Sequence, residues 1–243
     1  MIQLFSKMRK RLLLEKSFNT YIKYALGEIT LVVVGILIAL SINNWNDDRL
    51  KRKKELQYLI EIKESLEFDL IHEIDPAIHS FRNNLKRDSL LLTDFFFKNN
   101  GMSQDAIRNA FLMYGSDWNI LFNMSTFNNL FSIGLDLISS DAIRRDISTL
   151  YNYHYPYILD CQHQTDKFFI EQLQPTYNEV IGTWYRNTDK SAKELEDIRT
   201  HGKLQSIMKS MRYYTNNRLI LLVKVKPRIE QLISDIEHES QRF

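Results

Sequence analysis

Two carboxylate-histidine pairs have the spacing that comes closest to a reactive site. Asp69 stands three positions before His72, and Asp160 stands three positions before His163. On a helix this spacing places both side chains on one face, as in the pairs that hold two iron ions inside four-helix bundles. The carboxylate usual there is Glu, and the many acidic residues of this chain supply such pairs by chance. We therefore predict no metal ligand and no cofactor from these pairs.

The other reactive side chains are equally unspecific. His72 and His79 lie seven apart with Asp75 between them, a set that binds metal at some surfaces but is more typical of a solvated helix edge. Cys161 is the single cysteine and has no Cys or His neighbour at zinc spacing. Phosphate loops, nucleophile elbows and zinc-protease motifs are absent from the sequence. No catalytic residue is predicted.

A dense aromatic run, YNYHYPY, extends from Tyr151 to Tyr157. Such rings line a ligand groove in some proteins and pack between helices in others. Both interpretations stay open at the level of sequence.

An apolar run near the start of the chain predicts a membrane anchor. Residues 29–42 read ITLVVVGILIALSI without a charge. The stretch from Tyr24 to Trp45 makes a helix of about 33 Å, enough to cross a hydrocarbon core of about 30 Å. Tyr21, Tyr24 and Trp45 stand where aromatic rings meet the two headgroup regions. The rival interpretations are a core helix of a soluble protein and a signal peptide cleaved near Ala39.

Small residues and one acid distinguish this predicted anchor. Gly27, Gly35 and Ala39 fall on one helix face, where a second copy could approach closely, so a homodimer through the anchor is a possible assembly. Glu28 is interpreted as an edge residue that reaches interfacial water, the alternative being a functional carboxylate within the membrane.

Basic residues surround the apolar run. Those before it lie in an amphipathic segment, residues 1–23, which is expected to rest on an anionic lipid surface. Equal numbers precede and follow the span, so charge counting does not orient the chain. They are Lys7, Arg9, Lys10, Arg11, Lys16 and Lys23 before it, and Arg49, Lys51, Arg52, Lys53, Lys54 and Lys63 after it. The net charge of only +2 gives no sign of a nucleic-acid partner.

The remaining residues, 46–243, are predicted to form one soluble helical domain. Only 7 Gly and 4 Pro occur in 243 residues, so turns are few and elements long. An apolar stripe predicts a helix over residues 48–98 with a bend at Pro76. It comprises Leu59, Ile62, Leu66, Leu70, Ile74, Ala77, Phe81 and Leu85. The fold class is mostly α: one N-terminal transmembrane helix followed by a long-helix antiparallel bundle.

Capping residues and prolines predict the other helices. Ser103 caps a helix over residues 104–113, and Ser125 caps a short one that ends at Gly134. Ser139 or Ser140 begins a long helix that is interrupted at Pro156 and closed at Pro175. Residues 114–124 read as an irregular connection. The last helix covers residues 202–239 with a kink at Pro227, although residues 218–225 also resemble a strand.

Residues 22–47, IKYALGEITLVVVGILIALSINNWND, resemble the N-terminal signature of a family of single-pass bacterial membrane proteins of unknown function. That signature runs YALGEI, an aliphatic stretch, GILIAL and INNWNE, and Ser41 stands where a longer polar residue is usual. Residues 125–151 are similar to the family's middle region. The resemblance implies an anchor in the inner membrane of a Gram-negative bacterium, a cytoplasmic N-terminus and a periplasmic body. It implies no reaction, ligand or catalytic residue.

These observations favour a membrane-anchored interaction or sensing module over an enzyme. Its expected partners are the lipid bilayer and either a small ligand or an envelope protein. About 23 residues precede the span, too few for an output domain, so any signal would pass to a separate protein. The alternative is a membrane-tethered enzyme, with or without a metal ion, whose site is assembled inside the bundle.

Overall fold

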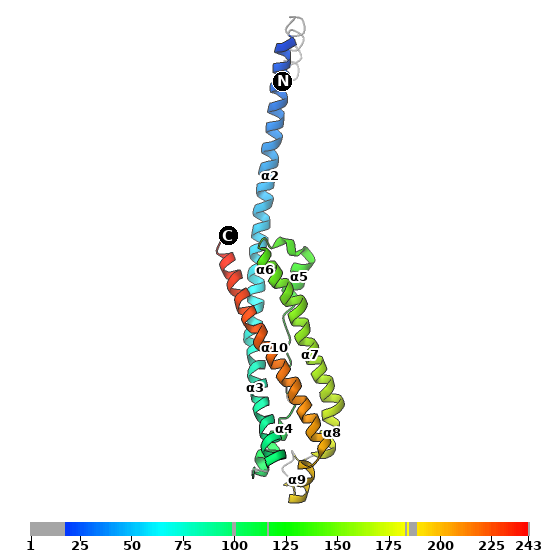
Figure 1. Cartoon of the computed structure of the whole chain (residues 1–243). Coiled ribbons are helices and arrows are strands. Elements are labelled where there is room, and N and C mark those ends of the chain that lie inside the picture. Colours follow the sequence, from blue (N-terminus) through cyan, green and yellow to red (C-terminus); the bar gives the residue numbers. More distant parts are fainter. Residues whose placement is uncertain (1–17, 99–100, 116, 183, 185–188, 243) are drawn as a thin grey trace. The chain divides into compact units, whose positions relative to one another are not determined.

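Helices account for nearly all of the secondary structure, as the scarcity of Gly and Pro predicts (Figure 1). The computed structural model describes residues 18–98, 101–115, 117–182, 184 and 189–242, and no strand occurs among them. Residues 1–17 of the predicted interfacial segment lie outside the described residues. The chain divides into two units, Met1–Lys54 and Glu55–Phe243.

The first unit contains the apolar part of α2 (Phe18–Asp69). One helical stretch of the described residues is long and apolar enough to cross a membrane, and its most apolar window has a mean hydropathy of 2.4. None of that window is buried, which argues against the core helix of a soluble protein. Its length and composition fit a membrane span and also fit a signal sequence.

Three long helices form the frame of the second unit: α3 (Asp75–Ser89), α7 (Tyr155–Phe168) and α10 (Gly202–Ser240). Figure 1 shows them side by side, with α10 packed against both of the others. Side-chain contacts give the direction of each pair. Lys226 bonds Asp75 and Lys63 bonds Glu237, so α10 runs antiparallel to α2 and α3. The antiparallel bundle predicted from the sequence is confirmed.

Three π-helical turns each end two residues before a proline. At each turn a backbone N–H donates to the carbonyl five residues earlier. A proline has no N–H and its ring collides with the carbonyl four residues back, so the wider turn admits it without breaking the helix. The turns are η1 (Leu70–Ile74) before Pro76, η4 (Leu150–His154) before Pro156, and η5 (Phe169–Leu173) before Pro175.

One sequence prediction about this region was wrong, and another was confirmed. Pro175 does not close a helix, because η5 absorbs it and α8 (Gln174–Val180) continues beyond. The helix predicted over residues 202–239 is confirmed, because α10 continues through Pro227 and residues 218–225 lie inside it and not in a strand. The apolar residues of that stretch pack against α3 and α7, which a helix satisfies as well as a strand would.

Short elements complete the second unit. Ser103 caps α4 (Gln104–Leu112) and Ser140 caps α6 (Asp141–Thr149), as predicted. Ser125 does not cap α5 (Ser125–Ile133) as predicted but is its first residue, and its hydroxyl donates to Asn123. Gly134 ends α5 at a φ of 115°, as predicted. The other elements are η2 (Leu90–Lys98), η3 (Leu135–Leu137) and α9 (Ala192–Arg199).

Two apolar clusters fill the bundle, one after the other along its length. The first includes Phe81 on α3 and Leu222 on α10, and the second includes Leu91 on η2 and Met211 on α10. Between them, at the level of Asn84, Asp88, Gln162, Thr215 and Arg218, the buried side chains are polar. A polar layer therefore separates the two halves of the core.

Gly115 begins the connection between α4 and α5 and has a left-handed φ of 77°. A Cβ added there would meet the ring of Phe169 at 2.6 Å. Gly101 has a similar φ of 65°, but a Cβ added there meets nothing within 4 Å. The two glycines share a backbone conformation and differ in their surroundings.

We expect Gly115→Ala to lower the free energy of unfolding more than Gly101→Ala does. Both variants bear a left-handed penalty of about 1 kcal/mol, and only the first adds overpacking of about 1–3 kcal/mol. Chemical unfolding of the full chain in detergent, followed by helical circular dichroism, measures the difference. Equal losses in the two variants would show that Phe169 moves aside freely.

Candidate functional site

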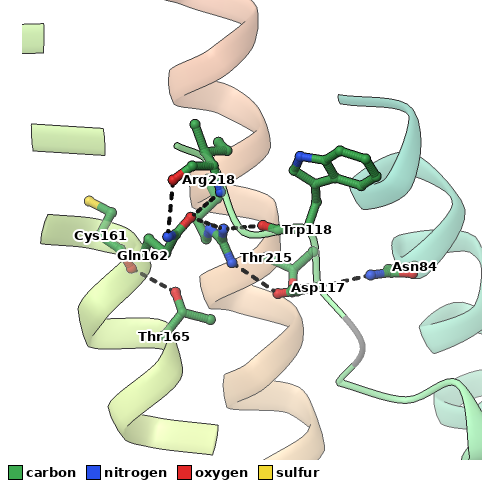
Figure 2. A network of polar contacts seen from close by, with 9 residues as sticks. Asn84, Asp117, Trp118, Cys161, Gln162, Thr165, Thr215 and Arg218 are labelled. Atoms are coloured by element: carbon green, nitrogen blue, oxygen red, sulfur yellow. Dashed lines mark hydrogen bonds and ion pairs between the residues drawn. The ribbon is translucent and has the colours of Figure 1, made fainter. Parts of the chain in front are cut away.

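The polar layer is organised around the buried guanidinium of Arg218 on α10 (Figure 2). It donates to the carbonyl of Trp118 at 2.7 Å and to Oε1 of Gln162 at 2.9 Å. Its Nη1 also lies 3.4 Å from Oδ2 of Asp117. Its Cζ lies over the ring of Phe81, 4.5 Å from the ring centroid. One side chain thus joins α3, α7 and the connection that contains Asp117.

The other groups of the layer also bond to that connection. Oδ1 of Asp117 accepts from Asn84 at 2.7 Å, and its Oδ2 accepts from Thr215 at 3.2 Å. The side chain of Gln162 accepts from the N–H of Ile120 at 2.8 Å. Burial lowers the pKa of Arg218, and the charge of Asp117 opposes this effect. With its groups turned toward one another, the layer has the arrangement of a structural clamp and not of a reaction centre.

We expect Arg218→Leu to destabilise the fold by about 3–5 kcal/mol, because it leaves Asp117 as a buried carboxylate without its cation. Arg145→Leu is the matched control, since Arg145 is exposed on α6 and its loss is expected to change stability by less than about 0.5 kcal/mol. Both are measured by chemical unfolding. A loss below about 1 kcal/mol for Arg218→Leu would contradict the clamp.

The sequence analysis missed Arg218, Asp117 and Gln162. A signal was present, because Arg218 stands seven residues after Met211 and four before Leu222, on the buried stripe of α10. An arginine on such a stripe requires partners. Those partners come from connections and helices far away in sequence, so the pattern does not name them.

The carboxylate-histidine pairs do not assemble into a site. Asp69 is fully buried, and its carboxylate accepts from the N–H of Asn123 at 3.0 Å and from the hydroxyl of Tyr155 at 2.9 Å. His72 is exposed and packs on Phe68 instead. Asp160 and His163 are both exposed on α7. Among the described residues, no group of three or more His, Cys, Asp or Glu side chains is placed to hold a metal ion.

Two buried carboxyl groups have raised pKa values. Burial raises the pKa of Asp69 to about 6, against the lowering effect of its two hydrogen bonds. Burial raises the pKa of Asp88 to about 7, partly offset by the charge of Arg212. For each acid the folded protein holds the proton more tightly than the unfolded chain does. Their contribution to stability is therefore present at low pH and is lost as the pH rises toward about 7.

We expect Asp88→Asn to remove most of this pH dependence. Relative to the wild type, the variant gains up to about 4 kcal/mol of stability between pH 4 and pH 8, because an amide has no proton to lose. Unfolding titrations at a series of pH values measure this slope, and the exposed Asp160→Asn serves as control. A slope in Asp88→Asn equal to that of the wild type would refute the assignment.

The aromatic run of residues 151–157 divides between core and surface. Tyr151 stacks on Phe127 with ring centroids 4.5 Å apart, and Tyr155 stacks on Phe122 at 3.7 Å. Both tyrosines are buried, as the packing interpretation predicts. Tyr153 and Tyr157 point outward, which fits the groove interpretation. The packing interpretation is therefore confirmed for the two buried tyrosines, whereas the ligand-groove interpretation of the two exposed ones stays a prediction.

Tyr153 and Tyr157 form one wall of a groove between η4, α7 and α10. Their rings lie nearly parallel, 6.3 Å apart with an angle of 8°. Lys224 and Arg228 of α10 line the same hollow, which has a volume of about 170 Å³. Its remaining lining is His154, Ile158, Leu221 and Val225. The hollow thus combines aromatic, cationic and apolar surface.

A second hollow of about 290 Å³ adjoins the first and shares His154 and Arg228 with it. Asp146, Thr149 and Gln231 add polar groups to its lining. Nε2 of His154 is buried and has no hydrogen-bond partner among the described residues. Burial and the nearby charge of Arg228 lower the pKa of His154. The two hollows make this groove a candidate for a ligand site in the second unit.

The predicted anchor residues Tyr24, Glu28, Gly35, Ala39 and Trp45 all lie in the part of α2 that belongs to the first unit. Hydroxyl groups there bond to the helix itself, Thr30 to the carbonyl of Leu26 and Ser41 to that of Leu37. Such bonds satisfy polar groups where water is absent. The guanidinium of Arg49 lies 5.5 Å from the ring of Trp45. The side chain of Tyr21 is outside the described part of the structure.

These features define a helical-bundle protein whose described residues include a candidate membrane span near the N-terminus. The chain belongs to a family of unknown function, DUF6090, whose sequence profile matches residues 28–171. That match begins inside the predicted anchor and ends inside η5. Searches of curated proteins and of solved structures found no match.

Proposed function

We propose that this protein is a membrane-anchored interaction or sensing module, held in the inner membrane of a bacterium by residues 24–45. The N-terminus is cytoplasmic and the helical body is periplasmic. The body binds a small ligand or an envelope protein in the groove lined by Tyr153, Tyr157, Lys224 and Arg228. The observation that carries the proposal is an apolar helical stretch with none of its most apolar window buried, joined to a folded body with an open groove.

Physical arguments support the insertion of the apolar stretch into a bilayer. An unburied aliphatic helix is unstable in water, and a bilayer removes that apolar surface from water. Asn43 and Asp47 bond each other directly after the apolar run, as expected where a helix returns to water. The orientation rests on the family resemblance of residues 22–47, because the basic residues on the two sides are equal in number.

The remaining parts of the proposal concern partners. The first partner is the lipid bilayer itself. A homodimer through Gly27, Gly35 and Ala39 stays a prediction, and a Cβ added at either glycine meets nothing within 4 Å. Nothing in the described residues indicates catalysis, so the enzyme alternative gains no support from the structure.

A reporter fused after Phe243 tests the anchor and its orientation. We expect a reporter that works only in the periplasm to be active, and the fusion to stay in the membrane fraction after a carbonate wash. Activity of a cytoplasmic reporter instead would overturn the orientation. A soluble periplasmic product would show that the apolar stretch is a cleaved signal peptide. Replacing Leu37 and Ile38 by Asp is the control, because two charges at mid-span prevent insertion.

A further inference from the structure

We propose that the groove between η4, α7 and α10 binds a small organic anion that carries a planar ring. The proposal rests on the proposed function, because it names the ligand class for the same groove. It follows from two pairs of side chains that line one hollow: the tyrosines 153 and 157, and the cations Lys224 and Arg228.

The cations are available to a ligand. Lys224 and Arg228 stand four apart on α10, so both project from the same helix face. Both are exposed, and neither forms an ion pair or side-chain hydrogen bond with another described residue. Lys226, two positions from each, differs in being paired with Asp75 and Glu230. The groove therefore has two charges that form no ion pair with a carboxylate of the described residues.

The electrostatics of the hollow favour an anion. Its lining contains no acidic residue, and Arg228 repels the protonated form of His154. The buried Nε2 of His154 also lacks a hydrogen-bond partner among the described residues. A phosphate or carboxylate in the hollow would bond to the cations and offset their mutual repulsion. Asp146 lines only the second hollow, so the anionic group belongs in the first.

The tyrosines and the floor indicate the rest of the ligand. Tyr153 and Tyr157 are 62% and 49% exposed, and they hold their rings parallel. The floor beside them is apolar, formed by the buried side chains of Ile158 and Val225. Aromatic faces and an apolar floor favour a planar ring over a fully hydrated ion. At about 170 Å³, the hollow suits one ring with its charged group.

Isothermal titration calorimetry on the full chain in detergent micelles tests the proposal, with phenyl phosphate as the probe. Inorganic phosphate supplies the charge alone and phenol supplies the ring alone. We expect phenyl phosphate to bind at least tenfold more tightly than either. The double variant Lys224→Gln with Arg228→Gln is expected to weaken its binding roughly tenfold or more, because it removes two charge-assisted bonds.

Arg82→Gln with Lys86→Gln is the matched control, since these cations are also exposed and four apart, on α3. It is expected to change the affinity less than twofold. Equal weakening in both double variants, or equal affinity for phosphate and phenyl phosphate, would overturn the proposal. So would the absence of binding at millimolar concentration. If phenyl phosphate does not bind but the reporter fusion is membrane-bound and periplasmic, the proposed membrane-anchored module is retained and only the proposed ligand class is wrong.

Discussion

An extended peptide that runs through a helical bundle has no neighbouring strand to which its N–H and C=O groups can bond. Residues 117–123 are such a peptide without regular secondary structure, with Ile120 buried and Trp118 and Leu121 exposed (Figure 1). Burial of unpaired backbone groups costs about 1–3 kcal/mol each, so helix side chains must take the place of the missing strand. Glu73 accepts from the N–H of Leu121, Asp69 from that of Asn123, and Gln162 from that of Ile120.

This constraint explains the polar residues inside the bundle. Asp69, Gln162 and Arg218 would be costly in an all-apolar core, and each is bonded to the backbone of residues 117–123. Because each partner meets one particular backbone group, the helices cannot slide past one another without breaking several bonds at once. The polar layer thereby fixes the register of α3, α7 and α10, while the two apolar clusters provide most of the burial.

Local signals predicted the local structure well. The stripe from Leu59 to Leu85 predicted a helix and most of its buried face, and Ser103, Ser140 and Gly134 predicted helix ends. The prediction that a helix ends at Pro175 was wrong, because a proline usually ends a helix, whereas the π turn η5 accommodates this one. Nothing local distinguishes the two outcomes, since the π turn depends on how neighbouring helices hold the chain.

The candidate groove was only half predictable for a related reason. The run from Tyr151 to Tyr157 predicted aromatic packing. The helical period of 3.6 residues explains why alternate tyrosines of this run face opposite sides of the helix. Lys224 and Arg228, however, lie about 70 residues further along the chain, on a helix whose register no local pattern sets.

That register connects the clamp to the groove. Arg218 and Gln162 bond each other across α10 and α7, so the next two turns of α10 face the preceding turns of α7 and η4. Antiparallel packing then places Lys224 and Arg228 opposite Tyr157 and Tyr153 in one hollow. A slip by a single residue would turn the cations about 100° around the helix axis and separate them from the tyrosines. The buried clamp does not line the groove, and yet it aligns the groove's two walls.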